Sequence, residues 1–405
     1  MTKHISYSPF EAFRPHFNTL ALVGYSKFVK RPVSPIKLVL QNIYINVVLF
    51  FVVLYNLQHI LRVIQVRESL ALVVDTLFIL LTTLNTMGKQ MAFKFRRQRI
   101  EYIISIIDGP SFAPRKQFHL EVMKQNAVTM RRILRFYIGC ALFCGCLWTM
   151  FPLVNKALGI DVQFTAYFPF DTSYSPIFQI IVAYMSILIT LQAFGNVTMD
   201  CTIVAFYAQA RVQMQILGYN LQHLMDKPDE EDVSEDKVKI FKDARIDDNN
   251  YQLFYKRFVR CVIHYRRIKW LVKEIEEVFA ETLLFQLIVT AWVICMTVYK
   301  IVGLSMFSAE FVSMGMYLGC ILGQFFIYCY YGTQVKSESD SINTSVYCSE
   351  WLSLPPRHRR GLLIMMACSS KPITPRCAYI IPISLETYIS ILRASYTLFT
   401  FLDRK

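Results

Sequence analysis

The sequence predicts an all-α membrane protein, a bundle of seven transmembrane helices with the N-terminus in the cytoplasm and the C-terminus outside the cell. Three observations predict this fold: the composition, seven apolar stretches, and the alternation of basic residues between the links that join them. Of the 405 residues, 54% are hydrophobic, and the mean hydropathy is +0.37. Only 18% are charged, against about 25% in a soluble domain. This composition excludes a disordered chain, a disulfide-dense secreted domain and an ordinary cytosolic enzyme.

The seven predicted spans are of unequal strength, because a transmembrane helix needs about 20 mostly apolar residues. Five stretches are clearly apolar, at 38–60, 136–154, 177–197, 283–299 and 311–331. Two are weaker: the stretch 70–88 contains Asp75, and the stretch 384–402 contains Glu386 and Arg393. The apolar stretch 361–368 is too short to span. We expect it to form a short buried or interfacial helix.

The orientation follows from the distribution of lysine and arginine, which are enriched on the cytoplasmic side of membrane proteins. They gather in the N-terminal segment and in the second, fourth and sixth links. The other three links hold only Arg62 and Arg67, then Lys156, then Lys300. The net charge of +14 is thereby explained by topology. Membrane lipid is the expected surface partner, and nucleic acid is not.

These observations divide the chain into six parts. The long links around the fourth and fifth spans have apolar residues at helical spacing and should form cytoplasmic arms that pack on one another. An acidic stretch between the arms has few apolar residues, and we expect it to be mobile. The parts are a cytoplasmic N-terminal segment 1–37, spans one to four 38–208, the helical arms 209–277 with the acidic loop 226–250, spans five and six 278–333, a cytoplasmic anchor region 334–376 with the short helix, and the last span 377–405.

Catalytic and metal-binding patterns are missing from the sequence. It contains no His-Glu-x-x-His, no Gly-x-Ser-x-Gly and no Gly-rich phosphate loop. Most of the eleven cysteines lie in apolar runs, where a thiol acts as a small hydrophobic group. The sequence therefore predicts a protein that is not an enzyme and has no cofactor and no metal site.

The last span has one face of small and polar residues that ends in two larger apolar ones. At 100° per residue, this face is formed by Thr387, Ser390, Ala394, Thr397, Leu398 and Phe401. Such a stripe is typical of a helix that lines a water-filled pore, with the outer apolar pair as a gate. Small residues also mark close helix packing, so periodicity alone leaves both interpretations open.

Aromatic and sulfur-containing side chains are frequent in the outer halves of four spans. Such walls suit a pocket for a small, mostly apolar ligand, although ordinary helix packing with interfacial aromatics would give the same composition. The candidate ligand-binding residues are Phe78, Ile79, Phe143, Leu147, Trp148, Phe151, Phe178, Ile181, Tyr184, Met185, Leu188, Phe311, Met314 and Tyr317.

Three stretches in the C-terminal third resemble the insect odorant receptors. They are Tyr-Cys-Ser-Glu-Trp at 347–351 followed by Leu354 and Pro355, Cys-Tyr-Tyr-Gly-Thr-Gln at 329–334, and the last span from Ser384 to Phe399. The related gustatory receptors carry Thr-Tyr, five variable residues and Gln-Phe in the last span, a pattern that does not follow Tyr396 and Thr397. The resemblance therefore favours the odorant receptors over that related group.

This resemblance implies a subunit of a tetrameric, ligand-gated, non-selective cation channel. In the family, an outer-half pocket walled by spans two, three, four and six binds a small volatile ligand, and the last span lines the pore. The chain lacks the large insertion between spans four and five of the shared odorant co-receptor, so the resemblance implies a tuning subunit that joins the co-receptor in a heterotetramer. The expected location is the plasma membrane of olfactory sensory dendrites. A gustatory-type chemoreceptor, a G-protein-coupled receptor and a transporter are the alternatives.

Overall fold

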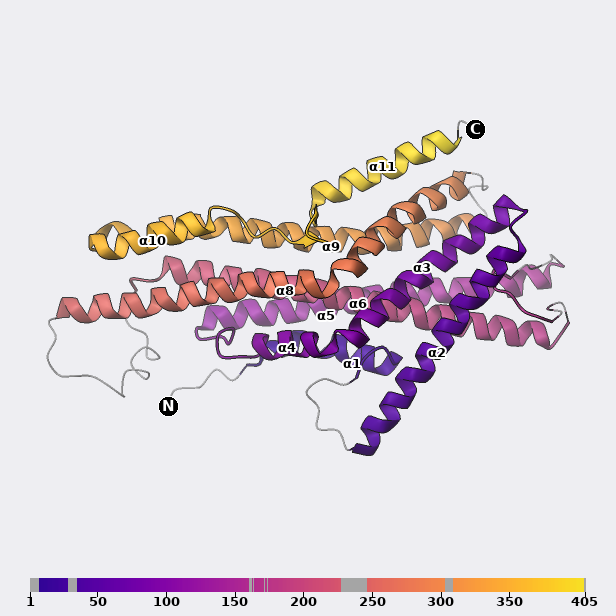
Figure 1. The fold of residues 1–405 in the computed structure, drawn as a ribbon, viewed down its shortest axis with the longest axis horizontal. Coiled ribbons are helices and arrows are strands. Elements are labelled where there is room, and N and C mark those ends of the chain that lie inside the picture. Colours follow the sequence, from indigo (N-terminus) through magenta and orange to yellow (C-terminus); the bar gives the residue numbers. More distant parts are fainter. Residues whose placement is uncertain are drawn as a thin grey trace.

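A computed structural model describes residues 7–27, 35–159, 162, 164–170, 172, 174–226, 246–302 and 309–403 (Figure 1). The acidic loop predicted at 226–250 lies largely outside these residues. The elements in chain order are η1 Pro9–Ala12, α1 Arg14–Val23, α2 Pro35–Gln65, α3 Leu70–Phe95, α4 Arg97–Ile107, α5 Gln117–Ala157, α6 Ile177–Gln222, α8 Ile246–Val302, α9 Ala309–Tyr347, η2 Trp351–Ser353, α10 Pro356–Ser369, β1 Arg376–Cys377, β2 Ile381–Pro382 and α11 Leu385–Asp403.

All seven predicted spans are helical, and the all-α class is confirmed. Among the described residues, six helices are long and apolar enough to cross a membrane, namely α2, α3, α5, α6, α8 and α9. The seventh, α11, has 19 residues. It lies obliquely beside α8 and α9, with the C-terminus near the end of the molecule where the predicted spans gather (Figure 1).

Four helices continue without a break far beyond the predicted spans. Helix α5 has 41 residues, α6 has 46, α8 has 57 and α9 has 39. At 1.5 Å per residue, α6 is roughly 69 Å long, more than twice the hydrocarbon thickness of about 30 Å. We call the parts beyond the spans, together with α4 and α10, the arms. Continuous helices thereby connect the spans to the arms, so a displacement of the spans can reach the arms.

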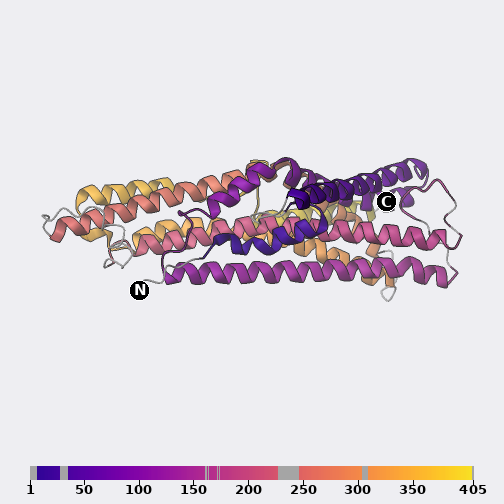
Figure 2. The same cartoon turned by 90° about the horizontal axis from the view of Figure 1, so that it is seen from below.

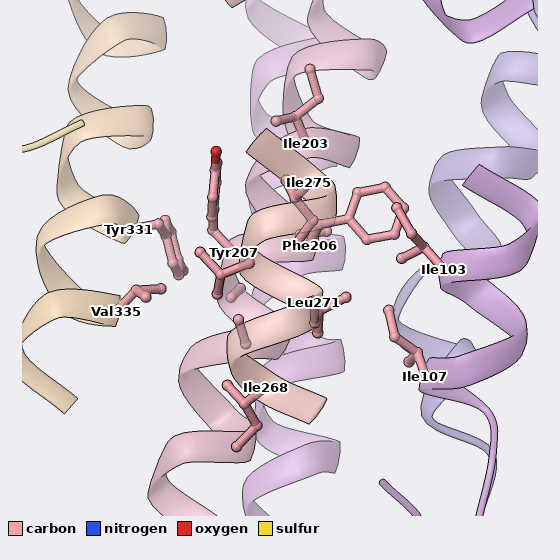
Figure 3. Packing of buried hydrophobic residues seen from close by; sticks show 14 of the residues in the cluster. Ile103, Ile107, Ile203, Phe206, Tyr207, Ile268, Leu271, Ile275, Tyr331 and Val335 are labelled. Atoms are coloured by element: carbon pink, nitrogen blue, oxygen red, sulfur yellow. The ribbon is translucent and has the colours of Figure 1, made fainter. Parts of the chain in front are cut away.

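The largest apolar core lies in the arms. Tyr207 of α6 and Leu271 of α8 are fully buried there, with Val335 of α9 and Ile103 of α4 packed around them (Figure 3). Helix α10 adds Leu362 and Met365 to the same cluster. In contrast, many large apolar side chains of α2 are exposed in the single chain, as Phe50 is at 63%. The arms therefore pack as a soluble domain does, whereas the exposed apolar surface of the spans suits lipid.

The N-terminal segment is folded onto this core, although the sequence analysis treated it only as a basic cytoplasmic segment. Helix α1 runs alongside α5 and α6 (Figure 2). Phe13 and Leu20 are fully buried, and the rings of Phe13 and Phe206 lie 4.8 Å apart between centroids. The Tyr25 ring fills the space beside Gly195, where an added Cβ would lie 2.6 Å from a ring carbon. The segment is thus part of the packed structure.

A very close backbone contact ties α9 to the chain just before α11. A Cβ built on Gly332 would lie only 2.1 Å from the carbonyl oxygen of Ile383. In addition, the Leu385 amide donates to Thr333 Oγ1 at 3.0 Å. The backbones of α9 and of Ile383 cannot move apart without a large cost in free energy. Glycine at 332 therefore allows the start of α11 to lie directly against α9.

We expect Gly332→Ala to destabilise the purified protein, because overpacking a closed contact costs about 1–3 kcal/mol. The thermal unfolding midpoint in detergent measures this. Gly319→Ala on the same helix is the matched control, because a Cβ there meets nothing within 4 Å and should leave the midpoint unchanged or raise it. Equal midpoints for the two variants would contradict the close contact.

Candidate functional site

A cavity of about 140 Å³ lies between α3, α5, α6 and α9. Its apolar walls come from each of these helices, with Phe78, Trp148, Ile189 and Ile321 among the lining side chains. On α6 it is lined between 189 and 197, nearer the arm end of the predicted span 177–197 than its outer end. A cavity of this size and character suits a small, mostly apolar molecule.

Aromatic rings form one wall of the cavity. The Tyr317 ring lies 4.9 Å from Phe78 and 6.0 Å from Trp148 between centroids, and both pairs are tilted. Such arrangements stabilise aromatic pairs beyond their buried area. Phe78 is buried, in a cluster with Val293 of α8 that Trp148 and Tyr317 also contact. The ring wall is therefore supported from behind, so its shape is set by packing.

Hydroxyl groups give this apolar cavity a small polar content. Thr82 Oγ1 donates to the carbonyl oxygen of Phe78 at 2.9 Å and lies 3.1 Å from the Tyr317 hydroxyl oxygen. Since the Thr82 hydroxyl has one hydrogen, Tyr317 is the donor in the second contact. The Tyr317 oxygen keeps its acceptor capacity, and Thr83 and Thr190 add hydroxyls to the lining. A ligand with one donor group could hydrogen-bond here.

Three cysteines also line the cavity. Cys144 Sγ of α5 and Cys320 Sγ of α9 lie 3.8 Å apart, and Cys140 is one turn before Cys144. Gly145 brings α6 close at the same level, because a Cβ there would lie 2.7 Å from Thr190 Oγ1. Thiols are polarizable and pack well against aromatic ligands.

The inner end of the cavity meets a buried ion pair. Asn196 and Gln324 line the cavity, and both also contact the pair. Lys89 Nζ of α3 lies 2.5 Å from Asp200 Oδ1 of α6, with side chains only 1% and 5% exposed. Lys89 Nζ donates to Asn196 Oδ1 at 2.8 Å, and Gln324 Nε2 donates to Asp200 Oδ2.

Tyr328 completes the network, since its hydroxyl donates to Asp200 Oδ1 at 2.6 Å. Both carboxylate oxygens and the ammonium group therefore have partners. That is the condition under which a buried pair is tolerated at all. The polar network of Lys89, Asn196, Asp200, Gln324 and Tyr328 joins α3, α6 and α9 directly beneath the cavity.

The structure brings four of the predicted ligand-binding residues into this cavity: Phe78, Ile79, Trp148 and Tyr317. The others whose side chains are described do not line it. Tyr184 donates to Gln58 Oε1 at 2.9 Å, Phe178 packs on Phe164 with centroids 5.5 Å apart, and Phe143 is 52% exposed. Ile181 and Leu188 are buried elsewhere, Leu147, Met185, Phe311 and Met314 are half-buried, and the side chain of Phe151 lies outside the described residues.

The predicted pore face lies on the open side of α11. Ser390, Ala394 and Thr397 are exposed in the single chain, whereas Thr387 is half-buried and donates to the Pro382 carbonyl at 2.6 Å. Helix α11 packs on α8 and α9, where Ser395 donates to the Ala291 carbonyl oxygen at 3.3 Å. Ile389 and Tyr396, outside the predicted pore face, are also exposed. The side chains of Leu398 and Phe401 lie outside the described residues.

Sequence reasoning missed the network below the cavity. Lys89 follows the apolar run 70–88 directly and is easily counted with the basic link, and Asp200 follows the run that ends at 197. The available signal was that a base and an acid lie at the C-terminal ends of the second and fourth predicted spans, which run in the same direction and so bring the two charges to the same side of the bundle. Such charges inside a membrane bundle pair with one another.

Comparison with known proteins gives one consistent result. The family model described as 7tm Odorant receptor matches residues 69–396. The chain is 22% identical to Odorant receptor Or1 of Anopheles gambiae over 80% of this chain and 79% of that protein, and 23% identical to Odorant receptor 46a, isoform A, of Drosophila melanogaster over 91% and 92%. The olfactory receptor OR5 of Machilis hrabei, whose structure was solved in complex with eugenol, superposes with a TM-score of 0.81 at 14% identity over 96% of this chain and 97% of that chain.

We expect Lys89→Met to destabilise the protein by about 3–5 kcal/mol, because it leaves the Asp200 carboxylate buried without its counter-charge. Thermal unfolding and the yield of monodisperse protein measure this loss. In a double-mutant cycle with Asp200→Leu, the double variant should lose less than the sum of the single losses. Lys94→Met on the same helix is the control, because its ammonium is bonded to Asn46 at an exposed site. If the stability losses of the two single variants simply added up in the double variant, Lys89 and Asp200 would not interact.

Proposed function

Because this chain belongs to the odorant receptor family, we propose that it is the tuning subunit of an odorant-gated, non-selective cation channel. Members of the family are receptors and not enzymes, and this chain is a multi-pass membrane protein. In the proposed mechanism, a small volatile ligand occupies the cavity between α3, α5, α6 and α9, and α11 lines the pore. The N-terminus and the arms lie in the cytoplasm, and the chain ends outside.

The cavity above a buried, hydrogen-bonded ion pair is the observation that carries this proposal. A ligand can open a channel only if it binds the open arrangement better than the closed one. Asn196 and Gln324 belong to the cavity wall and to the network at once. A ligand that displaces either amide therefore changes the balance of bonds that join α3, α6 and α9.

The pore assignment is supported by the two sides of α11. One side is packed on α8 and α9, and the rest of the surface exposes Ser390, Ala394 and Thr397 together with Ile389 and Tyr396, with no cover from the described residues. In a ring of four subunits, four such faces would meet at the axis. Small polar side chains there suit a wet pathway for cations.

The ligand class follows from the walls and from the similar receptor. The lining is aromatic, aliphatic and sulfur-rich with a few hydroxyls, and binding would come mainly from apolar burial at about 25 cal/mol per Å². The structure of OR5 from Machilis hrabei contains eugenol, a small aromatic molecule. We extend to this chain only that chemical class, a small and mostly apolar volatile.

The assembly proposed is a heterotetramer with the shared odorant co-receptor in the plasma membrane of olfactory sensory dendrites. Expression in voltage-clamped cells with and without the co-receptor tests it against a panel of volatiles. Cation current that requires both chains is the expected result. Surface delivery of both chains without any evoked current would reject the proposal.

We expect Trp148→Ala to raise the half-maximal ligand concentration at least tenfold, because it removes one ring of the aromatic wall. Dose–response curves in co-expressing cells measure this, and the reversal potential should not change. Phe143→Ala on the same helix is the matched control, because Phe143 is 52% exposed outside the cavity. A larger effect of Phe143→Ala would place the binding site on the side of α5 that faces away from this cavity.

We expect Ser390→Cys to make the evoked current sensitive to a charged, water-soluble thiol reagent, because residue 390 would face the wet pore. Leu392→Cys, half-buried two residues further on, should react much more slowly, and the unmodified chain with its native thiols sets the baseline. Current block is the readout. Block that is equal in both variants, or absent from Ser390→Cys, would reject the proposed pore face.

A further inference from the structure

The wall of the cavity between α3, α5, α6 and α9 includes a buried glutamine to which the proposed function assigns no role. Gln192 of α6 lines this cavity and is only 2% exposed. Ile189 and Asn196, three residues before it and four residues after it, line the cavity too, so the three share one face of the helix. Gln192 therefore lies one helical turn from Asn196 and from the polar network to which Asn196 belongs.

The side-chain amide of Gln192 is unpaired within the protein. Its Nε2 and Oε1 atoms are both buried, and neither makes a hydrogen bond with any group of the described residues. An amide can donate through its nitrogen and accept through its oxygen, so Gln192 retains both capacities. A buried polar group without a partner destabilises a folded chain. A ligand that supplies a partner here gains free energy that a hydrocarbon of the same shape does not gain.

Several other polar side chains of the wall are already bonded within the protein. Thr83 Oγ1 donates to Asn56 Oδ1 at 2.8 Å, which uses the hydrogen of that hydroxyl. Asn196 and Gln324 are bonded to the buried ion pair. A ligand that takes a hydrogen bond from one of these groups displaces an existing contact. Gln192 offers a donor and an acceptor without the loss of any described hydrogen bond.

The size of the cavity limits the body of the ligand. Its volume is about 140 Å³, and an apolar cavity of about 150 Å³ is known to bind benzene. The rings of Phe78, Trp148 and Tyr317 form a wall on which such a ring can pack. A hydroxyl group adds only one heavy atom and can both donate and accept. Ethers, esters and ketones can accept from the amide nitrogen but have no hydrogen to donate to its oxygen.

We propose that Gln192 is a specificity-determining residue of this cavity and selects volatiles that carry a hydroxyl group on a small apolar body. This inference rests on the proposed function and adds to it the polar group of the ligand. The hydroxyl bonds with the Gln192 amide, while the apolar body packs on the aromatic wall. Because Asn196 follows one turn later on the same helix, a ligand held by Gln192 lies next to the network that joins α3, α6 and α9.

Binding of three matched volatiles to the purified full-length protein in detergent tests this proposal. Benzyl alcohol donates and accepts, benzyl methyl ether only accepts, and ethylbenzene does neither. By calorimetry, benzyl alcohol should bind about tenfold more tightly than ethylbenzene, which is the difference that one hydrogen bond supplies. The ether should lie between them. Gln192→Met should abolish this preference, because methionine keeps a similar volume and lacks the amide.

The quantity compared between variants is the ratio of the affinities for the alcohol and for the hydrocarbon, which cancels the partition of each volatile into detergent. Trp148→Ala should weaken the binding of all three volatiles, which places them in this cavity. Gln209→Met is the matched control and should leave the ratio unchanged. Gln209 lies on the same helix, is also 2% exposed with an unpaired Nε2, and does not line the cavity.

The thermal unfolding midpoint of the unliganded protein distinguishes ligand selection from a structural role. Because the Gln192 amide has no partner among the described residues, Gln192→Met should raise the midpoint. If the amide stabilised the helix packing through a hydrogen bond, the same substitution would lower the midpoint and leave the affinity ratio unchanged.

Four outcomes would overturn the role of Gln192: equal affinities of the unmodified protein for benzyl alcohol and ethylbenzene, a preference that survives Gln192→Met, an equal loss of preference in Gln209→Met, or a lowered midpoint in Gln192→Met. Each of them leaves the proposed function standing, because an odorant-gated channel requires only that some volatile evokes current. No saturable binding of any of the three volatiles would overturn the role of Gln192 and the placement of the ligand in this cavity together.

Discussion

The ion pair between Lys89 and Asp200 is the interaction on which the bundle depends most. It stands where three helices meet, with both side chains almost completely buried. A charge buried in such surroundings is strongly unfavourable unless every polar atom has a partner. Asn196, Gln324 and Tyr328 supply those partners, so the pair specifies how α3, α6 and α9 are rotated against one another. Breaking any of these contacts costs free energy. Such a cost keeps the two arrangements of a two-state element distinct.

The length of the helices connects this pair to the rest of the molecule. Helix α6 carries Asp200 and continues without a break to Gln222, and α9 carries Tyr328 and continues to Tyr347. Below the network both helices enter the dense apolar core of the arms, where Tyr207 and Val335 are fully buried. Packed interiors transmit small displacements because they are dense and little compressible. On the proposed mechanism, a ligand above the network biases the packing of the spans, and the arms hold the subunit in place while α11 moves.

Much of the fold could be predicted from the sequence, because apolar runs of sufficient length and helical spacing in the links are local signals. The extension of the fourth and fifth spans into paired arms was visible in this way. The packing of Phe13 on Phe206 was not, because a ten-residue helix in a basic segment has no signal of its own. The candidate cavity was predicted only in part. Trp148 and Tyr317 line it, but Phe143 on the same helix as Trp148 faces outward. Composition indicates which spans are aromatic, whereas helix rotation and the relative offset of neighbouring helices decide which rings meet.

The most direct test of the central claim is an electron cryomicroscopy map of the receptor with an agonist chosen from the volatile panel. The proposed account predicts ligand density between Trp148 and Tyr317, within reach of the amides of Asn196 and Gln324, and intact density for Lys89 and Asp200 in the unliganded map. Ligand density beside Tyr184 or Phe178, with this cavity empty, would contradict it.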